Sequence, residues 1–216
     1  MTSILRNAAD ALDHLLLGAA DLDAAIAWFE ARTGVRAAIG GSHPGMGTRN
    51  ALVSLGAPHY LEIIAADPAQ SSYGFHLDVR TLSEPRLVTW AASTSDIDGV
   101  AQSASHSGLE VVGPRDGSRA RPDGTRLHWR TLGVTTTFGA AAGDPVPFFI
   151  QWAAGTRHPS EDAPGGCRLL SLECAHPDPD ALRQTLASLS LDINVQRAST
   201  PAIRATIDTP RGRLKL

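Results

Sequence analysis

The chain repeats one pattern three times: a short apolar run, an Asp-x-Asp signal, a stretch with helical periodicity and then strands. The Asp-x-Asp signals stand at Asp21–Asp23, Asp96–Asp98 and Asp178–Asp180 and are nearly evenly spaced. A repeat on this scale constrains the fold more than any single motif, because each copy is expected to form the same supersecondary unit. The chain is therefore built from three related units.

Each Asp-x-Asp signal predicts the start of a helix. The first carboxylate can accept hydrogen bonds from the free N–H groups of the first turn, and the second adds negative charge where the helix dipole favours it. Gly34 and Gly108 are expected to end the first two helices. Apolar residues follow each signal at helical spacing, as in Leu22, Ala25, Ile26 and Phe29 of the first unit.

Strand patterns separated by turn residues follow each helix. We expect such strands over 50–55, 60–65, 126–132, 148–153, 203–207 and 213–216. Strand–helix–strands, repeated, predicts an α+β fold with curved antiparallel sheets and helices outside. We place the first two units in a domain at 10–157, as about 10–67 and 84–157, and a smaller βαβββ-like C-terminal extension at 167–216.

Composition excludes several classes of partner. The net charge is −3, and no face of clustered Lys and Arg is evident, so we expect no nucleic-acid partner. No signal-peptide pattern opens the chain, and Leu15–Leu17 is too short to enter a membrane, so we expect a cytoplasmic protein without membrane contact. Cys167 and Cys174 are expected to be buried thiols that do not bridge each other.

Several short motifs occur together in one order, and their combination resembles a known superfamily. They are Leu12–Leu15, Asp21–Asp23, Trp28–Glu30, Thr33–Gly34, His43–Asn50, Tyr60–Ile64 and Pro147–Trp152. The chain resembles glyoxalase-like proteins of the vicinal-oxygen-chelate (glyoxalase/bleomycin resistance/dioxygenase) superfamily from residue 10 to about 160. The resemblance implies that two βαβββ modules pair and form a cup.

The resemblance also implies a metal site, held by side chains from the first and fourth strands of both modules. His14 and Glu62 match the first-module positions, and imidazole with carboxylate suits Zn, Ni, Mn or Fe. In the second module Thr89 stands opposite His14, and Gln151 (or Ile150, one residue earlier) stands opposite Glu62. Gln151 could supply a third ligand, whereas threonine is a poor one.

Glu62 is the candidate catalytic base. A metal would polarise a substrate with adjacent oxygens and stabilise a developing enediolate, while Glu62 takes the proton. The structural alternative is a core histidine, His14, hydrogen-bonded to Glu62. Relatives of this fold include lyases, isomerases, dioxygenases and metal-free drug-binding proteins, so the fold does not decide the chemistry.

The glycine-rich loop from His43 to Asn50 is a second candidate. It precedes a strand, so it is not a P-loop. His43, Arg49 and Asn50 could form a lid that grips an anionic substrate group, although an ordinary hairpin connection has the same composition.

Aromatic and basic residues of the second module complete the predicted substrate contacts. Trp90, Phe149 and Trp152 occupy strands that should border the cup, where they would either pack in the core or contact an apolar substrate. Arg119, Arg121 and Arg130 form a basic cluster, of which one is expected to line the cup unless surface ion pairs use them. We include Arg130 in the predicted site.

The leading functional hypothesis is a glyoxalase-like small-molecule enzyme, a metal-assisted lyase or isomerase. The alternative is a metal-free protein of the same fold that binds or sequesters an apolar small molecule. The strand edges of the C-terminal unit would also allow a homodimer.

Overall fold

The structure is a computed structural model, and it describes residues 5–121, 124–139 and 143–216. Its main feature is an eight-stranded sheet in the order β3-β4-β5-β2-β6-β9-β8-β7. The first module supplies β2 (Leu12–Gly18), α2 (Leu22–Thr33), β3 (Ala38–His43), β4 (Thr48–Ser54) and β5 (Tyr60–Ala66). The second supplies β6 (Arg86–Ser93), α3 (Ile97–His106), β7 (Glu110–Ala120), β8 (Arg126–Thr135) and β9 (Phe148–Trp152). The predicted α+β fold of paired βαβββ modules is confirmed.

The two modules join through their first strands. β2 and β6 pair antiparallel at the centre of the sheet, and each has the fourth strand of its own module, β5 or β9, as a parallel neighbour. The remaining neighbours are antiparallel. The first and fourth strands of both modules therefore lie side by side at the centre of the sheet.

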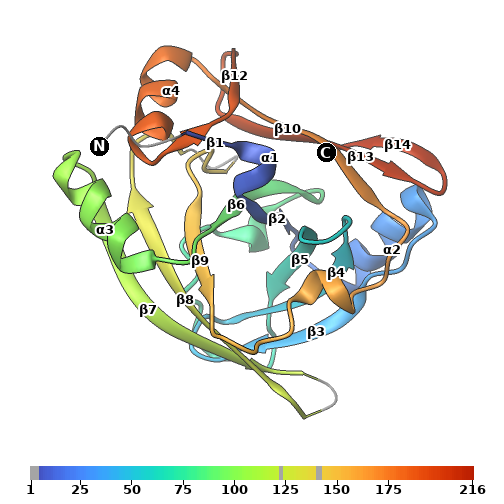
Figure 1. The fold of residues 1–216 in the computed structure, drawn as a ribbon. Coiled ribbons are helices and arrows are strands. Elements are labelled where there is room, and N and C mark those ends of the chain that lie inside the picture. Colours follow the sequence, from blue (N-terminus) through green and yellow to red (C-terminus); the bar gives the residue numbers. More distant parts are fainter. Residues whose placement is uncertain (1–4, 122–123, 140–142) are drawn as a thin grey trace.

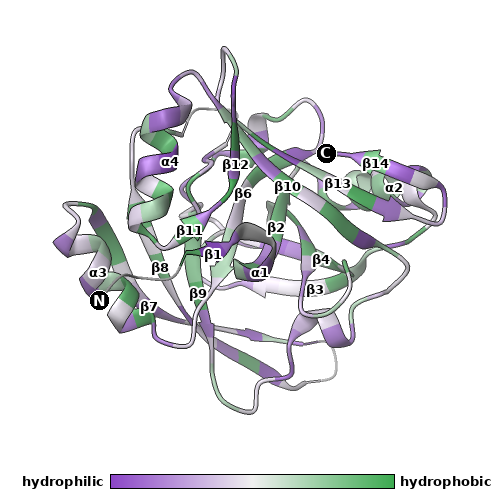
Figure 2. Cartoon of the chain, turned by 45° about the horizontal axis from the view of Figure 1, so that its top comes forward, coloured by the Kyte–Doolittle hydropathy of each residue, from purple (hydrophilic) through white to green (hydrophobic). Residues whose placement is uncertain are grey.

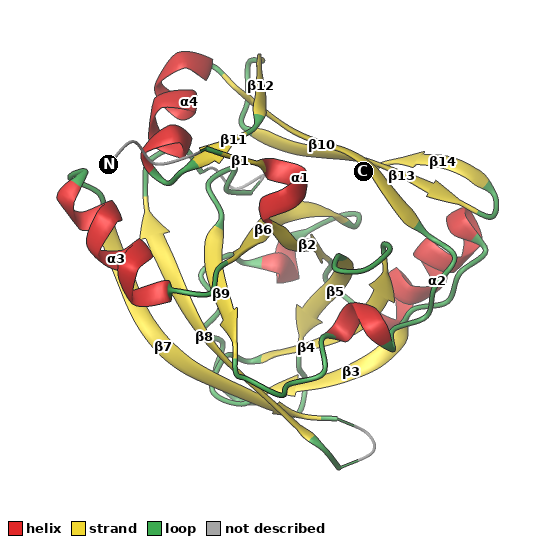
Figure 3. Cartoon of the chain, viewed as in Figure 1, coloured by secondary structure: helices red, strands yellow, loops and turns green. Residues whose placement is uncertain are grey.

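The sheet curls until its two edge strands meet. β3 and β7 run next to each other along the lower side of Figure 1, and the Arg119 guanidinium of β7 donates a hydrogen bond to the Gly40 carbonyl of β3. The helices α2, α3 and α4 (Pro179–Ser188) lie outside this curled sheet (Figure 3). The inner face of the sheet is thus enclosed by the protein's own strands.

Helix ends follow the local signals in the sequence. Asp21 caps α2 by accepting a hydrogen bond from the Ala24 N–H, and Asp96 and Asp178 cap α3 and α4 in the same way. Gly34 ends α2 in the left-handed conformation, with φ 77°. α3 has Ser107 as its cap and is followed by Gly108, which is also left-handed, with φ 81°. Side-chain capping supplies the hydrogen bonds that the first turn lacks, so short polar motifs predict these starts well.

The C-terminal unit has the expected order of elements but a different strand order. Its strands are β10 (Arg168–His176), β11 (Leu191–Asp192), β12 (Asn194–Arg197), β13 (Ala202–Thr209) and β14 (Gly212–Lys215). β10 lies between β12 and β13, whereas the first strand of each module ends that module's row of strands. β11 pairs instead with β1 (Arg6–Asn7), which precedes the short helix α1 (Ala8–Ala11). The third unit therefore does not extend the main sheet.

One continuous core joins the outer face of the main sheet to the helices and the C-terminal unit. It contains Leu15 and Leu61 of the sheet, Phe29 of α2, and Leu182 and Ile207 of the C-terminal unit, all of them buried. Apolar residues of β10 and β13 can be followed in Figure 2. A second, smaller apolar cluster of Leu16, Ile64, Val79 and Val88 occupies part of the inner face, and polar side chains share the rest of it.

Both cysteines are free and buried. Burial raises the pKa of the Cys174 thiol to about 12 and that of Cys167 to about 11, so both remain protonated near neutral pH. Among the described residues, no helix is long and apolar enough to cross a membrane.

Candidate active site

The candidate site forms where three neighbouring strands turn polar side chains toward the inner face. Side chains alternate between the two faces of a strand, so His14 of β2, Glu62 of β5 and Asn50 of β4 share one face. All three are buried. The alternation thus brings polar residues together on the face opposite the apolar core.

The Glu62 carboxylate lies at the centre of this group. The Asn50 amide nitrogen donates a hydrogen bond of 2.8 Å to Oε1 of Glu62. His14 Nε2 lies 3.4 Å from Oε2, and His43 Nε2 lies 3.7 Å from Oε1. The Glu62 side chain is 9% exposed and that of His43 is 16% exposed, so solvent reaches the group chiefly beside His43. One carboxylate therefore has a separate imidazole near each oxygen.

Asp13 holds His14 from the other side. Its Oδ1 lies 2.7 Å from His14 Nδ1, and its Oδ2 accepts from Trp152 Nε1 at 2.9 Å and faces His158 Nε2 at 3.2 Å. Burial by itself would raise the pKa of Asp13, but the hydrogen bonds to His14 and His158 outweigh it and hold this pKa well below its usual range. Asp13 is therefore an anion that orients the His14 ring.

A β-bulge explains why sequence analysis missed Asp13. Neighbouring residues of a regular strand point to opposite faces, which would place Asp13 and His14 apart. The pairing of β2 with β6 shifts between Leu12 and His14, so Asp13 is the extra residue of a bulge. Bulges re-aim side chains, and this one lets Asp13 reach the ring of its own neighbour.

His43 is held in the same manner by the strand that follows it. Its Nδ1 lies 2.9 Å from the Thr48 hydroxyl, and its Nε2 lies 3.3 Å from the Asn50 amide nitrogen. Burial lowers the pKa of His43, with Glu62 acting against this effect, so the ring is neutral near neutral pH. A neutral ring that donates from Nδ1 to Thr48 can accept at Nε2 from Asn50.

Aromatic side chains form the wall beside His14. The Tyr60 ring stacks on the His14 ring with centroids 4.5 Å apart, and Phe148 meets it edge-on at 5.7 Å. Burial raises the pKa of Tyr60 well above its usual value, so the hydroxyl keeps its proton. The inner face therefore combines a polar cluster with an apolar wall.

Gln151 is placed away from Glu62 by the alternation of β9. Phe148 and Trp152 turn toward the inner face, whereas Gln151 turns toward α3. Its amide oxygen accepts a hydrogen bond of 2.9 Å from the Ile97 N–H at the start of α3. The oxygen that would have been a third metal ligand is thus used to cap a helix.

Four other predicted contacts also lie apart from the Glu62 group. Trp90 and Phe149 belong to the buried core, and Trp90 Nε1 donates to the Pro145 carbonyl. Arg49 pairs with Asp23 at 3.2 Å, and Arg130 pairs with Asp98 at 2.7 Å. Of the predicted site residues, the structure gathers His14, His43, Asn50 and Glu62, and it attaches Trp152 to them through Asp13.

Gly40 allows the close approach that positions Asn50. A Cβ atom at Gly40 would lie 2.3 Å from the Asn50 side-chain oxygen, which is buried and has no hydrogen-bond partner among the described residues. We expect Gly40→Ala to displace this amide, weaken its bond to Glu62 and destabilise the protein by about 1–3 kcal/mol. Urea denaturation measures the free energy of unfolding. Gly165→Ala is the control, because a Cβ at Gly165 meets open space. Equal stability of the two variants would contradict the prediction.

A family model and one solved structure agree with this architecture. A model of the glyoxalase-like domain matches residues 12–190. No curated protein matches the chain. Among solved structures, a hypothetical protein from Staphylococcus aureus is similar with a TM-score of 0.69 and 14% identity, over 94% of this chain and 97% of that one. Methylmalonyl-CoA epimerase from Mycobacterium tuberculosis has a TM-score of 0.47 and 20% identity, over 71% and 92%. The Staphylococcus aureus protein shares the fold over nearly the whole chain.

Proposed function

The chain belongs to the glyoxalase-like domain family, and from this we propose that it is a small-molecule enzyme. Its reaction is of the lyase or isomerase kind and moves a proton on a substrate with adjacent oxygens. The observation that carries the proposal is the buried Glu62 carboxylate, which is held by Asn50 and faces an imidazole at each oxygen. General acid–base catalysis needs a proton-transferring group of this kind, positioned by its neighbours.

The roles follow from the contacts. Asn50 fixes Oε1 of Glu62, which leaves the carboxylate in one orientation. His14, backed by the Asp13 anion, is placed to share a proton with Oε2. In this proposal Glu62 takes a proton from the carbon next to a substrate carbonyl and returns it, and His14 and His43 position it.

The sequence also suggested a metal that assists this reaction, and the side chains present do not fit a metal site. His14 and Glu62 are suitable ligands, but the Gln151 oxygen is bound to the Ile97 N–H and position 89 is a threonine. Among the described residues, no group of three or more His, Cys, Asp or Glu side chains is arranged to hold a metal ion. We therefore assign the proton transfer to protein side chains and derive no step through a metal.

This assignment predicts weak metal retention. His43 Nε2 also faces Glu62, but it accepts from the Asn50 amide, so two protein ligands remain. Two ligands bind a divalent ion far less firmly than the three or four of established zinc sites. We expect protein purified without an affinity tag, loaded with Zn, Ni, Mn or Fe and then dialysed, to keep well below one ion per chain. Elemental analysis measures the ratio, with His14→Ala as the control for nonspecific binding. Near one ion per chain in the parent protein, and its loss in His14→Ala, would contradict the prediction.

A proton-exchange assay tests the proposed function. The protein is incubated in D2O with a panel of small 2-hydroxy acids and 2-oxo acids, and proton NMR follows the signal of the carbon-bound hydrogen next to the carbonyl. We expect the protein to exchange this hydrogen for deuterium in at least one compound. Binding without exchange throughout the panel would favour the alternative, a metal-free protein that binds or sequesters a small molecule. A homodimer and a cytoplasmic location stay predictions.

A further inference from the structure

Arg119 carries a buried charge that its own protein leaves largely unpaired. The residue is 4% exposed, and its guanidinium donates to the Gly40 carbonyl. Within the described ranges it has no other hydrogen-bond acceptor and no carboxylate at ion-pairing distance. Burial lowers the pKa of Arg119, against the opposing influence of Glu62 and Tyr60. Because a buried charge is costly without a partner, an anion from outside the protein would stabilise this site.

A cavity lies at this guanidinium. It has a volume of about 240 Å³, and its walls include Ala38, Ile39, Leu52, Ala163, Arg119 and Arg121. Asp162 also lines it, but this carboxylate is ion-paired with Arg121. Drug-sized ligand pockets measure roughly 300–1,000 Å³, so this space suits a smaller molecule. The free positive charge in the cavity is therefore that of Arg119.

The cavity adjoins the Glu62 group. Leu52, one of its apolar walls, stands directly opposite Glu62 in the pairing of β4 with β5. Gly40, which also lines it, lies against the Asn50 amide that holds Glu62. A ligand anchored on Arg119 would thus extend along Leu52 toward the carboxylate proposed as the base.

We propose that this cavity binds the carboxylate of a small, mostly apolar organic acid, with Arg119 as the anion-binding residue. The planar fork of an arginine matches the two oxygens of a carboxylate, and the apolar walls match a short hydrocarbon chain. This names the substrate class of the proposed enzyme and so rests on the proposed function for its catalytic meaning. The binding itself can be tested without any turnover.

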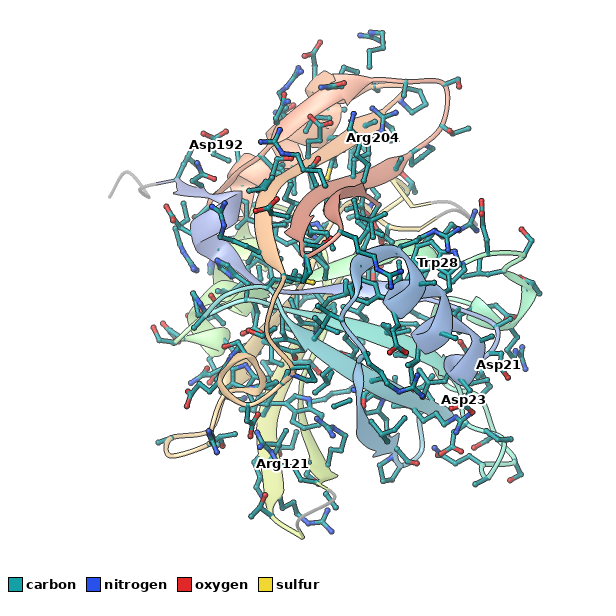
Figure 4. The ribbon with its side chains drawn as sticks, turned by 90° about the vertical axis from the view of Figure 1, so that its right-hand side faces the viewer. Asp21, Asp23, Trp28, Arg121, Asp192 and Arg204 are labelled. Atoms are coloured by element: carbon teal, nitrogen blue, oxygen red, sulfur yellow. The ribbon has the colours of Figure 1, made fainter. Side chains whose placement is uncertain are left out.

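The test compares an acid with its uncharged ester. The probes are 4-methyl-2-oxopentanoate and its methyl ester, and isothermal titration calorimetry measures their affinities for the full chain. We expect the acid to bind the parent protein at least about tenfold more tightly than the ester, and Arg119→Met to remove this preference. Arg204→Met is the matched control, because Arg204 is exposed on β13 of the C-terminal unit, far from Arg121 at the cavity (Figure 4). It should keep the preference.

Two outcomes would overturn the inference. One is an ester that binds the parent protein as tightly as the acid, a measurement that needs no variant. The other is Arg119→Met, shown to be folded by circular dichroism, with undiminished affinity for the acid. Glu62→Gln should still bind the acid, so a lost proton exchange with intact binding separates the proposed reaction from the anion site.

Discussion

Glu62→Gln is expected to lower the rate of proton exchange by about 10²–10⁴-fold, the range that general acid–base catalysis usually contributes. Glutamine has nearly the same shape and can still accept the hydrogen bond from Asn50. It cannot take up a proton from carbon near neutral pH. The fold should therefore survive while the chemical step is lost. The rate of deuterium incorporation, measured by NMR at saturating substrate, reports this step.

Glu110→Gln is the matched control for this experiment. Glu110 is an exposed residue of β7, outside the Glu62 group, and the same chemical change there should leave the exchange rate unaltered. Circular dichroism checks that both variants are folded. A folded Glu62→Gln protein that exchanges at the parent rate would show that another group is the base, and the proposed role of Glu62 would then be wrong.

Asp13→Asn is expected to destabilise the protein by about 3–5 kcal/mol, as is typical when one partner of a buried charged pair is removed. Asp13 faces three groups, His14 Nδ1, Trp152 Nε1 and His158 Nε2, with two acceptor oxygens. Asparagine offers one oxygen and no charge. It can keep the bond from Trp152 only with its amide N–H facing His14 Nδ1, which must then lose its proton and accept. The free energy of unfolding in urea measures the loss.

The pH dependence of this loss has a definite sign. The folded-state pKa of Asp13 lies below its ordinary value, so its ionised form stabilises the protein at pH values above the unfolded-state pKa of about 4. That stabilisation declines as the pH falls below this value toward the folded-state pKa. The difference in stability between the parent protein and Asp13→Asn should therefore be largest near neutral pH and shrink in acid.

Asp98→Asn provides the comparison for Asp13. Asp98 pairs with Arg130 at the surface, where solvent screens the charges, so its loss should change stability little. A stability difference between the parent and Asp13→Asn that stays constant from neutral pH into acid would show that the Asp13 charge does not stabilise the fold. Equal losses in the two variants would lead to the same conclusion.

Local sequence determined the secondary structure and the class of fold. Asp-x-Asp caps, glycine ends and strand alternation act within a few residues, so the predicted strands at 60–65 and 148–153 match β5 and β9 closely. The family resemblance assigned His14 and Glu62 to one site, and the structure pairs their strands, β2 and β5. These features were predictable because their causes lie in the residues themselves.

Only the tertiary structure decided which side chains complete the site. The bulge in β2 turned Asp13 toward His14, and the face of β9 on which Gln151 stands directed its oxygen to α3. The meeting of the edge strands β3 and β7 brought Arg119 beside Gly40, 79 positions away in the chain. Strand register and sheet curvature arise from contacts between distant segments, and a change of one residue in register reverses the face of every side chain. Local sequence patterns therefore do not predict the register or the curvature.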